Sequence, residues 1–160
     1  MQLPKNNWKF LLIIFLAAGL FGSCDKNRVF EQNKSISQYS WDYNVPLTFS
    51  VDITDTVSTN NMYINVRNDG TYRFSNLFLF VNTVLPQGQH LRDTVEITLA
   101  SPDGQWLGKG LGDIYANRYL FRENFRFPQK GTYRFELIQA MRVNPLLGIM
   151  DAGIRIEKGK

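Results

Sequence analysis

The chain has 160 residues, a formal net charge of +4, and 44% apolar and 20% charged residues. These values fit one globular domain and exclude global disorder. The chain has one Cys and one His, which excludes an internal disulfide and a zinc site built from Cys and His, because such a site takes several of these ligands.

Residues 1–23 are predicted to be the signal peptide of a lipoprotein. Lys5 and Lys9 precede an uninterrupted apolar run, residues 10–22 (FLLIIFLAAGLFG). This run is too short to cross a membrane as a helix, which takes about 20 residues. It is followed directly by Ser and Cys24, a pattern that resembles a bacterial lipobox. We therefore expect cleavage before Cys24, lipid on its thiol and the membrane as a partner; an ordinary signal peptide and a short N-terminal anchor are the alternatives.

The polar segment that follows is predicted to be a tether. Residues 24–44 show no sustained period, so we interpret them as the lipidated N-terminus and a tether, followed by a first strand or a wrapping segment, with the folded domain at 45–160. Without residues 1–23 the net charge falls to +2. A nearly neutral chain gives no reason to expect a nucleic-acid partner.

From residue 47 onward the pattern is that of strands. Apolar and polar residues alternate in several segments, which predicts half-buried strands. These segments are residues 47–54, 62–67, 91–99, 133–138 and 150–157. Turn signals separate them, for example Ser-Pro-Asp-Gly at 101–104.

Two further segments complete the predicted architecture. Residues 77–84 (LFLFVNTV) begin as a continuous apolar run, typical of a central strand covered on both faces. Residues 115–127 are ambiguous, because three Arg spaced by four fit a helix face while the aromatic residues favour short strands. Seven to nine short strands predict an all-β fold, an antiparallel β-sandwich or jelly roll.

No residue pattern points to catalysis. The stretch Gly108–Gly112 contains Lys109, but it lacks the spacing of a phosphate-binding loop and no helix follows it, so we interpret it as a loop with close backbone approach. His90 has no Ser or Cys partner in a recognisable motif. Asp93 and Asp113 are a candidate carboxylate pair for glycoside hydrolysis, but nothing in the sequence sets their separation. We expect no enzyme activity, no cofactor, no metal and no small-molecule substrate.

A contact surface for a protein partner is predicted in the loop 105–115 and the Arg-rich segment 118–126. Residues 105–160 carry a net charge of +5, against −3 for residues 24–104. The loop adds aromatic residues, which are common in protein interfaces. The residues expected to form the surface are Trp106, Lys109, Asp113, Tyr115, Arg118 and Arg122.

Several sequence segments resemble one family. They are NRVFEQ at 27–32, YINVRN at 63–68, SNLFLFV at 75–81, SPDGQWLGKGLGDIY at 101–115, NPLLGI at 144–149 and GIRIEK at 153–158. Together with the lipobox Cys they resemble the gliding-motility lipoprotein GldH family of the Bacteroidota. The resemblance implies a lipoprotein needed for gliding, which in these bacteria is tied to type IX secretion. It brings no catalytic residues, and Cys24 alone transfers, as the lipidation site.

Three functions follow as hypotheses. The first is a non-enzymatic, lipid-anchored envelope protein that helps to assemble a motility or secretion complex through protein partners. We expect it to face the periplasm, because residues 25–27 lack the acidic cluster that resembles a surface-export signal in these bacteria. The second is a glycan-binding module with a groove lined by aromatic residues and amides. The third is an envelope hydrolase with perturbed carboxylates in a cleft.

Overall fold

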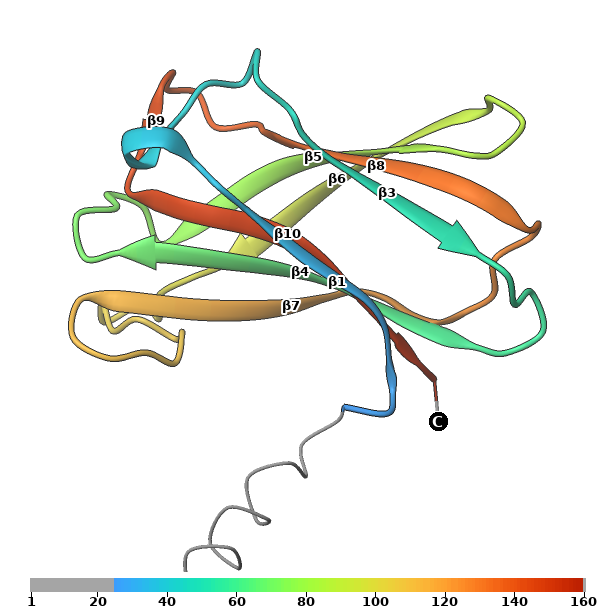
Figure 1. The fold of residues 1–160 in the computed structure, drawn as a ribbon. Helices are drawn as coiled ribbons and strands as arrows, with labels where there is room; N and C mark the ends of the chain where they lie inside the picture. The colour runs from blue at the N-terminus through green and yellow to red at the C-terminus, as the bar shows by residue number, and fades with distance from the viewer. Residues whose placement is uncertain (1–24, 160) are drawn as a thin grey trace, which may run out of the picture.

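The computed structural model describes residues 25–159, and the predicted signal peptide and Cys24 lie outside them. The described chain is a sandwich of antiparallel sheets (Figure 1). Its elements are β1 (Arg28–Ser35), the 3-10 turn η2 (Ser37–Tyr39), β2 (Ser40–Trp41), β3 (Leu47–Ile53), β4 (Asn60–Asp69), β5 (Asn76–Val84), β6 (His90–Thr98), β7 (Ile114–Phe125), β8 (Gly131–Gln139), β9 (Leu146–Leu147) and β10 (Ile149–Lys158).

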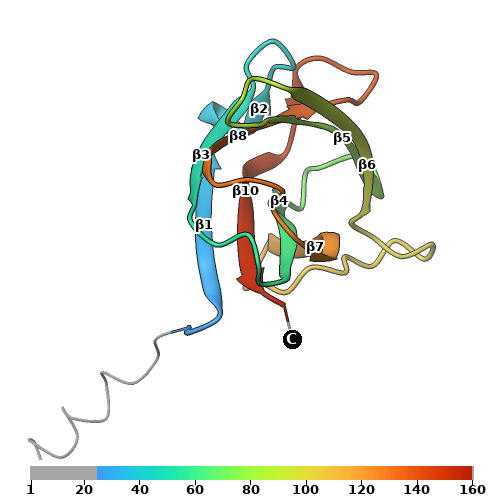
Figure 2. The ribbon, with the colours of Figure 1, turned by 90° about the vertical axis from the view of Figure 1, so that its right-hand side faces the viewer.

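The strands form two four-stranded sheets. Sheet I has the order β1-β10-β4-β7, and sheet II has the order β3-β8-β5-β6, while β2 and β9 form a short separate pair. Every pairing is antiparallel. The turned view in Figure 2 shows sheet II arching over sheet I. The predicted all-β sandwich is therefore confirmed, with eight long strands and two of only two residues.

The core lies between the sheets and follows the alternation of the sequence. In β3 the residues Leu47, Phe49, Val51 and Ile53 are buried, while the residues between them are half-buried or exposed. β4 and β8 show the same pattern. Each large apolar side chain buried in this way stabilises the fold by about 1.5–3 kcal/mol relative to exposure, so the alternation sets which face of each strand turns inward.

The folded domain starts earlier than predicted. Arg28–Ser35 forms β1, which pairs with β10 along its length, and Trp41 is buried in the core. The predicted tether over 24–44 is thus corrected: strand and core residues begin at 28, not 45. The polar sequence of this segment hid the strand, because β1 is an edge strand and few of its side chains contact the core.

Residues 115–127 also differ from the prediction of short strands. β7 is one strand of 12 residues at the edge of sheet I. Its pairing with β4 shifts where Met62 lies opposite Arg122 and Tyr63 opposite Leu120, which leaves Phe121 as an extra residue. A bulge of this kind reverses the faces to which the following side chains point.

β5 differs in burial from its prediction. It lies inside sheet II, between β8 and β6, but only alternate residues of it are buried. On its outer face Phe80 is half-buried and lies under the guanidinium of Arg92, 5.2 Å from the ring centre. The apolar run therefore predicted a central strand correctly, and its second face is covered by long side chains rather than by another layer.

Candidate functional site

The outer face of sheet I carries a network of charges centred on Arg155. Because strand side chains alternate, Ile154 and Ile156 enter the core while Arg155 and Glu157 point outward. The Arg155 side chain is nevertheless only 6% exposed. Its guanidinium forms ion pairs with three carboxylates, those of Asp25, Glu31 and Glu157.

Tyr63 and Arg118 complete this network. Glu31 on β1 and Tyr63 on β4 are the cross-strand partners of Arg155. Arg118 on β7 lies over the Tyr63 ring at 5.8 Å and is 3.7 Å from Glu31 and 3.5 Å from Glu157. One face of the sheet thus joins β1, β10, β4 and β7 through charged side chains.

The protonation states in the network follow from these contacts. Burial by itself lowers the pKa of Arg155, but its hydrogen bonds to Asp25, Glu157 and Glu31 outweigh burial and raise it above the ordinary value. The hydrogen bond from Arg155 lowers the pKa of Asp25 below its ordinary value of 3.8. Both groups are therefore charged at neutral pH, which keeps the N-terminal segment attached to β10.

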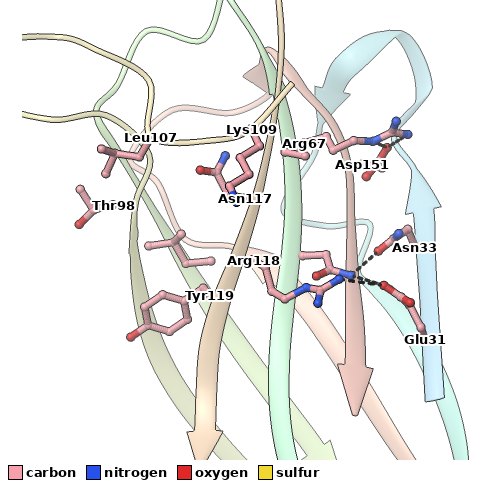
Figure 3. A pocket seen from close by; sticks show the side chains of 13 residues that line it. Glu31, Asn33, Arg67, Thr98, Leu107, Lys109, Asn117, Arg118, Tyr119 and Asp151 are labelled. Atoms are coloured by element: carbon pink, nitrogen blue, oxygen red, sulfur yellow. Dashed lines mark hydrogen bonds and ion pairs between the residues drawn. The ribbon is translucent and has the colours of Figure 1, made fainter. Parts of the chain in front are cut away.

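A groove of about 660 Å³ adjoins this network on sheet I and extends over β7 (Figure 3). Gly153 of β10 lets β1 approach closely, because an added Cβ would lie 2.0 Å from the Asn33 side-chain oxygen and 2.3 Å from a β1 carbonyl. Figure 3 shows Glu31 and Asn33 on the β1 side and Lys109 and Arg118 on the β7 side. Amides and charges of both signs line this groove, which suits a polar ligand or a polar protein segment.

Asp151 supplies an unsatisfied acceptor at one end of this groove. Its side chain is 3% exposed, and Arg67 donates through both Nε and Nη2 to the same carboxylate oxygen, Oδ2. The other oxygen, Oδ1, is buried without a hydrogen-bond partner. A buried acceptor left unpaired costs free energy, so Asp151 is held in place by Arg67 at some cost to stability.

The predicted contact residues do not form one surface. Arg118 lines the outer groove, whereas Arg122, beyond the bulge, forms an ion pair with Asp93 of β6 in the other sheet at 2.7 Å. Trp106 is half-buried and stacks on Tyr115 at 5.3 Å. Trp106 therefore packs partly against the core, with Tyr115 on its outer side.

Lys109 and Asp113 lie in an exposed hairpin that leads into β7. Lys109 exchanges two backbone hydrogen bonds with Ala116, of 2.9 and 2.8 Å. The hairpin needs its glycines, because an added Cβ on Gly110 would lie 1.6 Å from the carbonyl oxygen of Ile114. This agrees with the predicted loop of close backbone approach rather than a phosphate cradle.

Exposed apolar side chains occur on this hairpin and along β7. Leu111 at its tip is 91% exposed and Leu107 is 56% exposed. Ile114, Tyr119 and Leu120 are also exposed, and these five residues are called the β7 patch below. Tyr119 and Leu120 are consecutive in the strand, so they extend from its two faces. Large apolar side chains exposed on an edge strand are typical of protein interaction sites.

Sequence reasoning missed the centre of the charge network. Arg155, Glu31, Arg67 and Asp151 were not among the predicted residues. One signal was available: in GIRIEK the charges of Arg155 and Glu157 interrupt a run of core residues in a strand. Their partners on β1 and β4 are distant in sequence and carry no such signal.

The residues considered for catalysis lie in exposed or ion-paired positions. His90 is exposed at the start of β6, and Asp93 is engaged by Arg122. Within residues 25–159, no group of three or more His, Cys, Asp or Glu side chains is arranged to hold a metal ion. The same part of the chain contains no helix long and apolar enough to cross a membrane.

Comparisons with known proteins place the chain among lipoproteins. The family model described as GldH lipoprotein matches residues 28–156. The chain is 40% identical over 146 residues to the "Gliding motility lipoprotein GldH homolog" of Christiangramia forsetii, covering 87% of this chain and 89% of that protein. It is 38% identical over 153 residues to the "Gliding motility lipoprotein GldH" of Flavobacterium johnsoniae, covering 91% and 94%.

One solved structure is distantly similar. A chain of the T13 IBDV viral particle matches with a TM-score of 0.34 and 16% identity over 86% of this chain and 33% of its own length. A similarity of this size carries no argument about function. The family match and the two relatives, in contrast, cover most of the chain: it belongs to the GldH lipoprotein family.

Proposed function

We propose that this chain is a non-enzymatic, lipid-anchored envelope protein that supports gliding motility and the linked type IX secretion machinery by binding a protein partner. The names of the two relatives support the role in gliding. The observation that carries the binding role is the β7 patch, which exposes apolar side chains on an edge strand.

The edge of β7 suits a partner that adds a strand. In sheet I as described, β7 is the outermost strand, and the hairpin pairs with it at Ala116. Backbone groups farther along β7 can therefore accept or donate hydrogen bonds to an extended segment, while Tyr119 and Leu120 offer apolar contacts. The partner would contact sheet I at its edge and the hairpin at its tip.

The anchor in this proposal is lipid on Cys24. Cleavage before Cys24 leaves the domain attached to the membrane through acyl chains, and more than one chain is needed for stable attachment. The absence of an acidic cluster in residues 25–27 supports a domain that faces the periplasm.

The test is a cross-linked pull-down of the lipidated protein from its own membranes. We expect gliding or secretion components with the native chain and with Val45→Asp, which places a charge at a different exposed apolar residue. Leu111→Asp should lose most of these partners, and Cys24→Ala should lose the protein from the membrane fraction. Equal recovery with Leu111→Asp and Val45→Asp would show that the β7 patch is not the contact surface.

A glycan-binding module is the second candidate, supported by the groove beside Arg155. Asn33, Asn65 and Asn117 line it, together with Lys109 and Arg118. Amide and charged side chains are groups that bind sugar hydroxyls. Binding of peptidoglycan fragments to the purified protein, measured by calorimetry, should be lost in Asn65→Leu if this function is correct. Native protein that binds no glycan would exclude it.

A further inference from the structure

We infer that the domain is seated directly on the membrane that carries its lipid, on one basic end of the sandwich, and is not held on a flexible tether. This inference rests on the proposed lipidation of Cys24. The basic end is defined by Lys26, Arg28 and Lys158, together with Arg126, which follows the last residue of β7. Its partner is the headgroup layer of the anchoring leaflet.

The first argument is that the chain is fixed to the fold from residue 25 onward. The Asp25 carboxylate is paired with the buried Arg155. The Asp25 carbonyl accepts a hydrogen bond from the Arg28 amide at 3.2 Å, and the Asn27 carbonyl accepts one from the Lys158 amide at 2.8 Å. One side-chain contact and two backbone contacts thus hold the three residues that precede β1.

The second argument is chain length. Cys24 is joined to Asp25 by a peptide bond, and one residue spans at most about 3.6 Å. An acyl chain on Cys24 that enters the bilayer therefore brings Asp25 to the headgroup layer. Since Asp25 forms an ion pair with Arg155 of β10, the end of the sandwich beside Asp25 must also lie at the headgroup layer.

The third argument is the charge of this end. Lys26, Arg28 and Lys158 line one shared hollow. Two acids, Asp52 and Asp55, line the same hollow, and Arg28 also lies 3.7 Å from Glu31. The three cations of the hollow outnumber its two carboxylates, and this net positive charge favours phosphate-bearing and anionic headgroups.

The loop between β3 and β4 adds an apolar contact. Asp55 stabilises this loop by accepting backbone hydrogen bonds from Val57 at 2.8 Å and Ser58 at 3.1 Å. Val57 is then 77% exposed. An exposed apolar residue beside basic ones is the combination found on membrane-bound surfaces.

Seating at this end orients the β7 patch away from the membrane. Asn60 of β4 pairs with Lys158, at the basic end, and Asp69, at the other end of the same strand, pairs with Ile114 of the patch. β4 has 10 residues, so the two ends lie about 30 Å apart. Figure 1 shows that β1 begins on the side where the C-terminus also lies.

The test measures how close each end lies to the lipid. The chain has one Cys, at position 24. Once this thiol is in a thioether, a Cys introduced by Val57→Cys or Leu111→Cys is the free thiol to be labelled with a fluorophore. The full lipidated protein is placed in vesicles whose headgroups carry a nitroxide quencher. The control inserts about ten Gly and Ser residues between Cys24 and Asp25, which makes a flexible tether.

We expect several-fold stronger quenching at position 57 than at position 111, and nearly equal quenching at both once the tether is inserted. Asp25→Ala should reduce the contrast, and vesicles with anionic lipid should increase it. Equal quenching at both positions in lipidated protein without the insertion overturns the seating and leaves the proposed function intact. A chain without lipid on Cys24, shown by its mass, overturns the anchor and the seating together.

Discussion

The two ends of sheet I are held by different forces. At the basic end, the buried Arg155 joins three carboxylates from β10, β1 and the segment before it. At the other end, the hairpin before β7 is held by backbone contacts around Gly110 and leaves Leu111 almost fully exposed.

Because its two ends are held differently, one small sheet can both fix the N-terminal segment and leave apolar side chains exposed. Ion pairs to a buried guanidinium fix a segment firmly, since breaking them leaves a buried cation without its partners. A hairpin closed by backbone contacts needs no apolar side chain of its own for stability, so those side chains remain free for a partner. The first end suits an anchor, and the second suits recognition.

The largest expected loss of stability tests the Arg155 network at the basic end. Arg155→Met keeps the side-chain volume but leaves the carboxylates of Asp25, Glu31 and Glu157 close together without their cation. We expect the free energy of unfolding to fall by about 2–3 kcal/mol, less than for a fully buried pair because these carboxylates are partly exposed. Urea unfolding followed by tryptophan fluorescence measures it.

The matched control for this change is Arg134→Met on sheet II. Arg134 is 51% exposed and lies 3.4 Å from Glu136. An exposed pair of this kind contributes about 0–1 kcal/mol. Similar losses for the two Arg variants would mean that the Arg155 network does not differ from an ordinary surface ion pair.

A smaller effect is expected at the hairpin. Gly110→Ala places a Cβ against the Ile114 carbonyl, so the two hydrogen bonds between Lys109 and Ala116 must break. We expect a loss of about 2 kcal/mol, and fast hydrogen exchange at these two amides. Gly112→Asn is the control, because Gly112 has a φ of +63° with open space around it and Asn tolerates this conformation. Protection that survives Gly110→Ala would contradict the account of the hairpin.

Acid should release the ionic end before the rest of the fold. Since the pKa of Asp25 is lowered in the folded state, its contribution to stability is present above its ordinary value of 3.8 and is lost as the pH falls through the lower, folded value. Asp25 faces Arg155 and Arg28, both cationic throughout this range. The quenching contrast between positions 57 and 111 should therefore persist from pH 7 to about 4 and decline below. A decline near neutral pH would contradict the role of this contact.

The smallest effect on stability is expected from Leu111→Asp. A side chain that is 91% exposed makes few contacts within the domain, so the free energy of unfolding should change by no more than about 0.5 kcal/mol. The same variant should lose partners in the pull-down. A large loss of stability would show that Leu111 packs in the fold, and the loss of partners would then be indirect.

Much of the fold was predictable because alternation depends only on neighbouring residues. Leu47 to Ile53 alternate in the sequence and are buried alternately in β3. β1 was partly hidden, since an edge strand buries few side chains. The bulge at Phe121 was not predictable, because it depends on the register between β7 and β4. It separates Arg118 from Arg122, which their spacing had grouped together.

The sequence by itself determined that the chain is an antiparallel β-sandwich, and its segments resembled the correct family, while lipid on Cys24 stays a prediction. Those properties depend on local patterns. Only the tertiary structure decided which charges meet: Arg155 lies 124 residues from Glu31 and 130 from Asp25, and strand pairing brings them into contact. Ion pairs of this kind have no local pattern, because an Arg in a strand has the same sequence signature whether it faces water or three carboxylates.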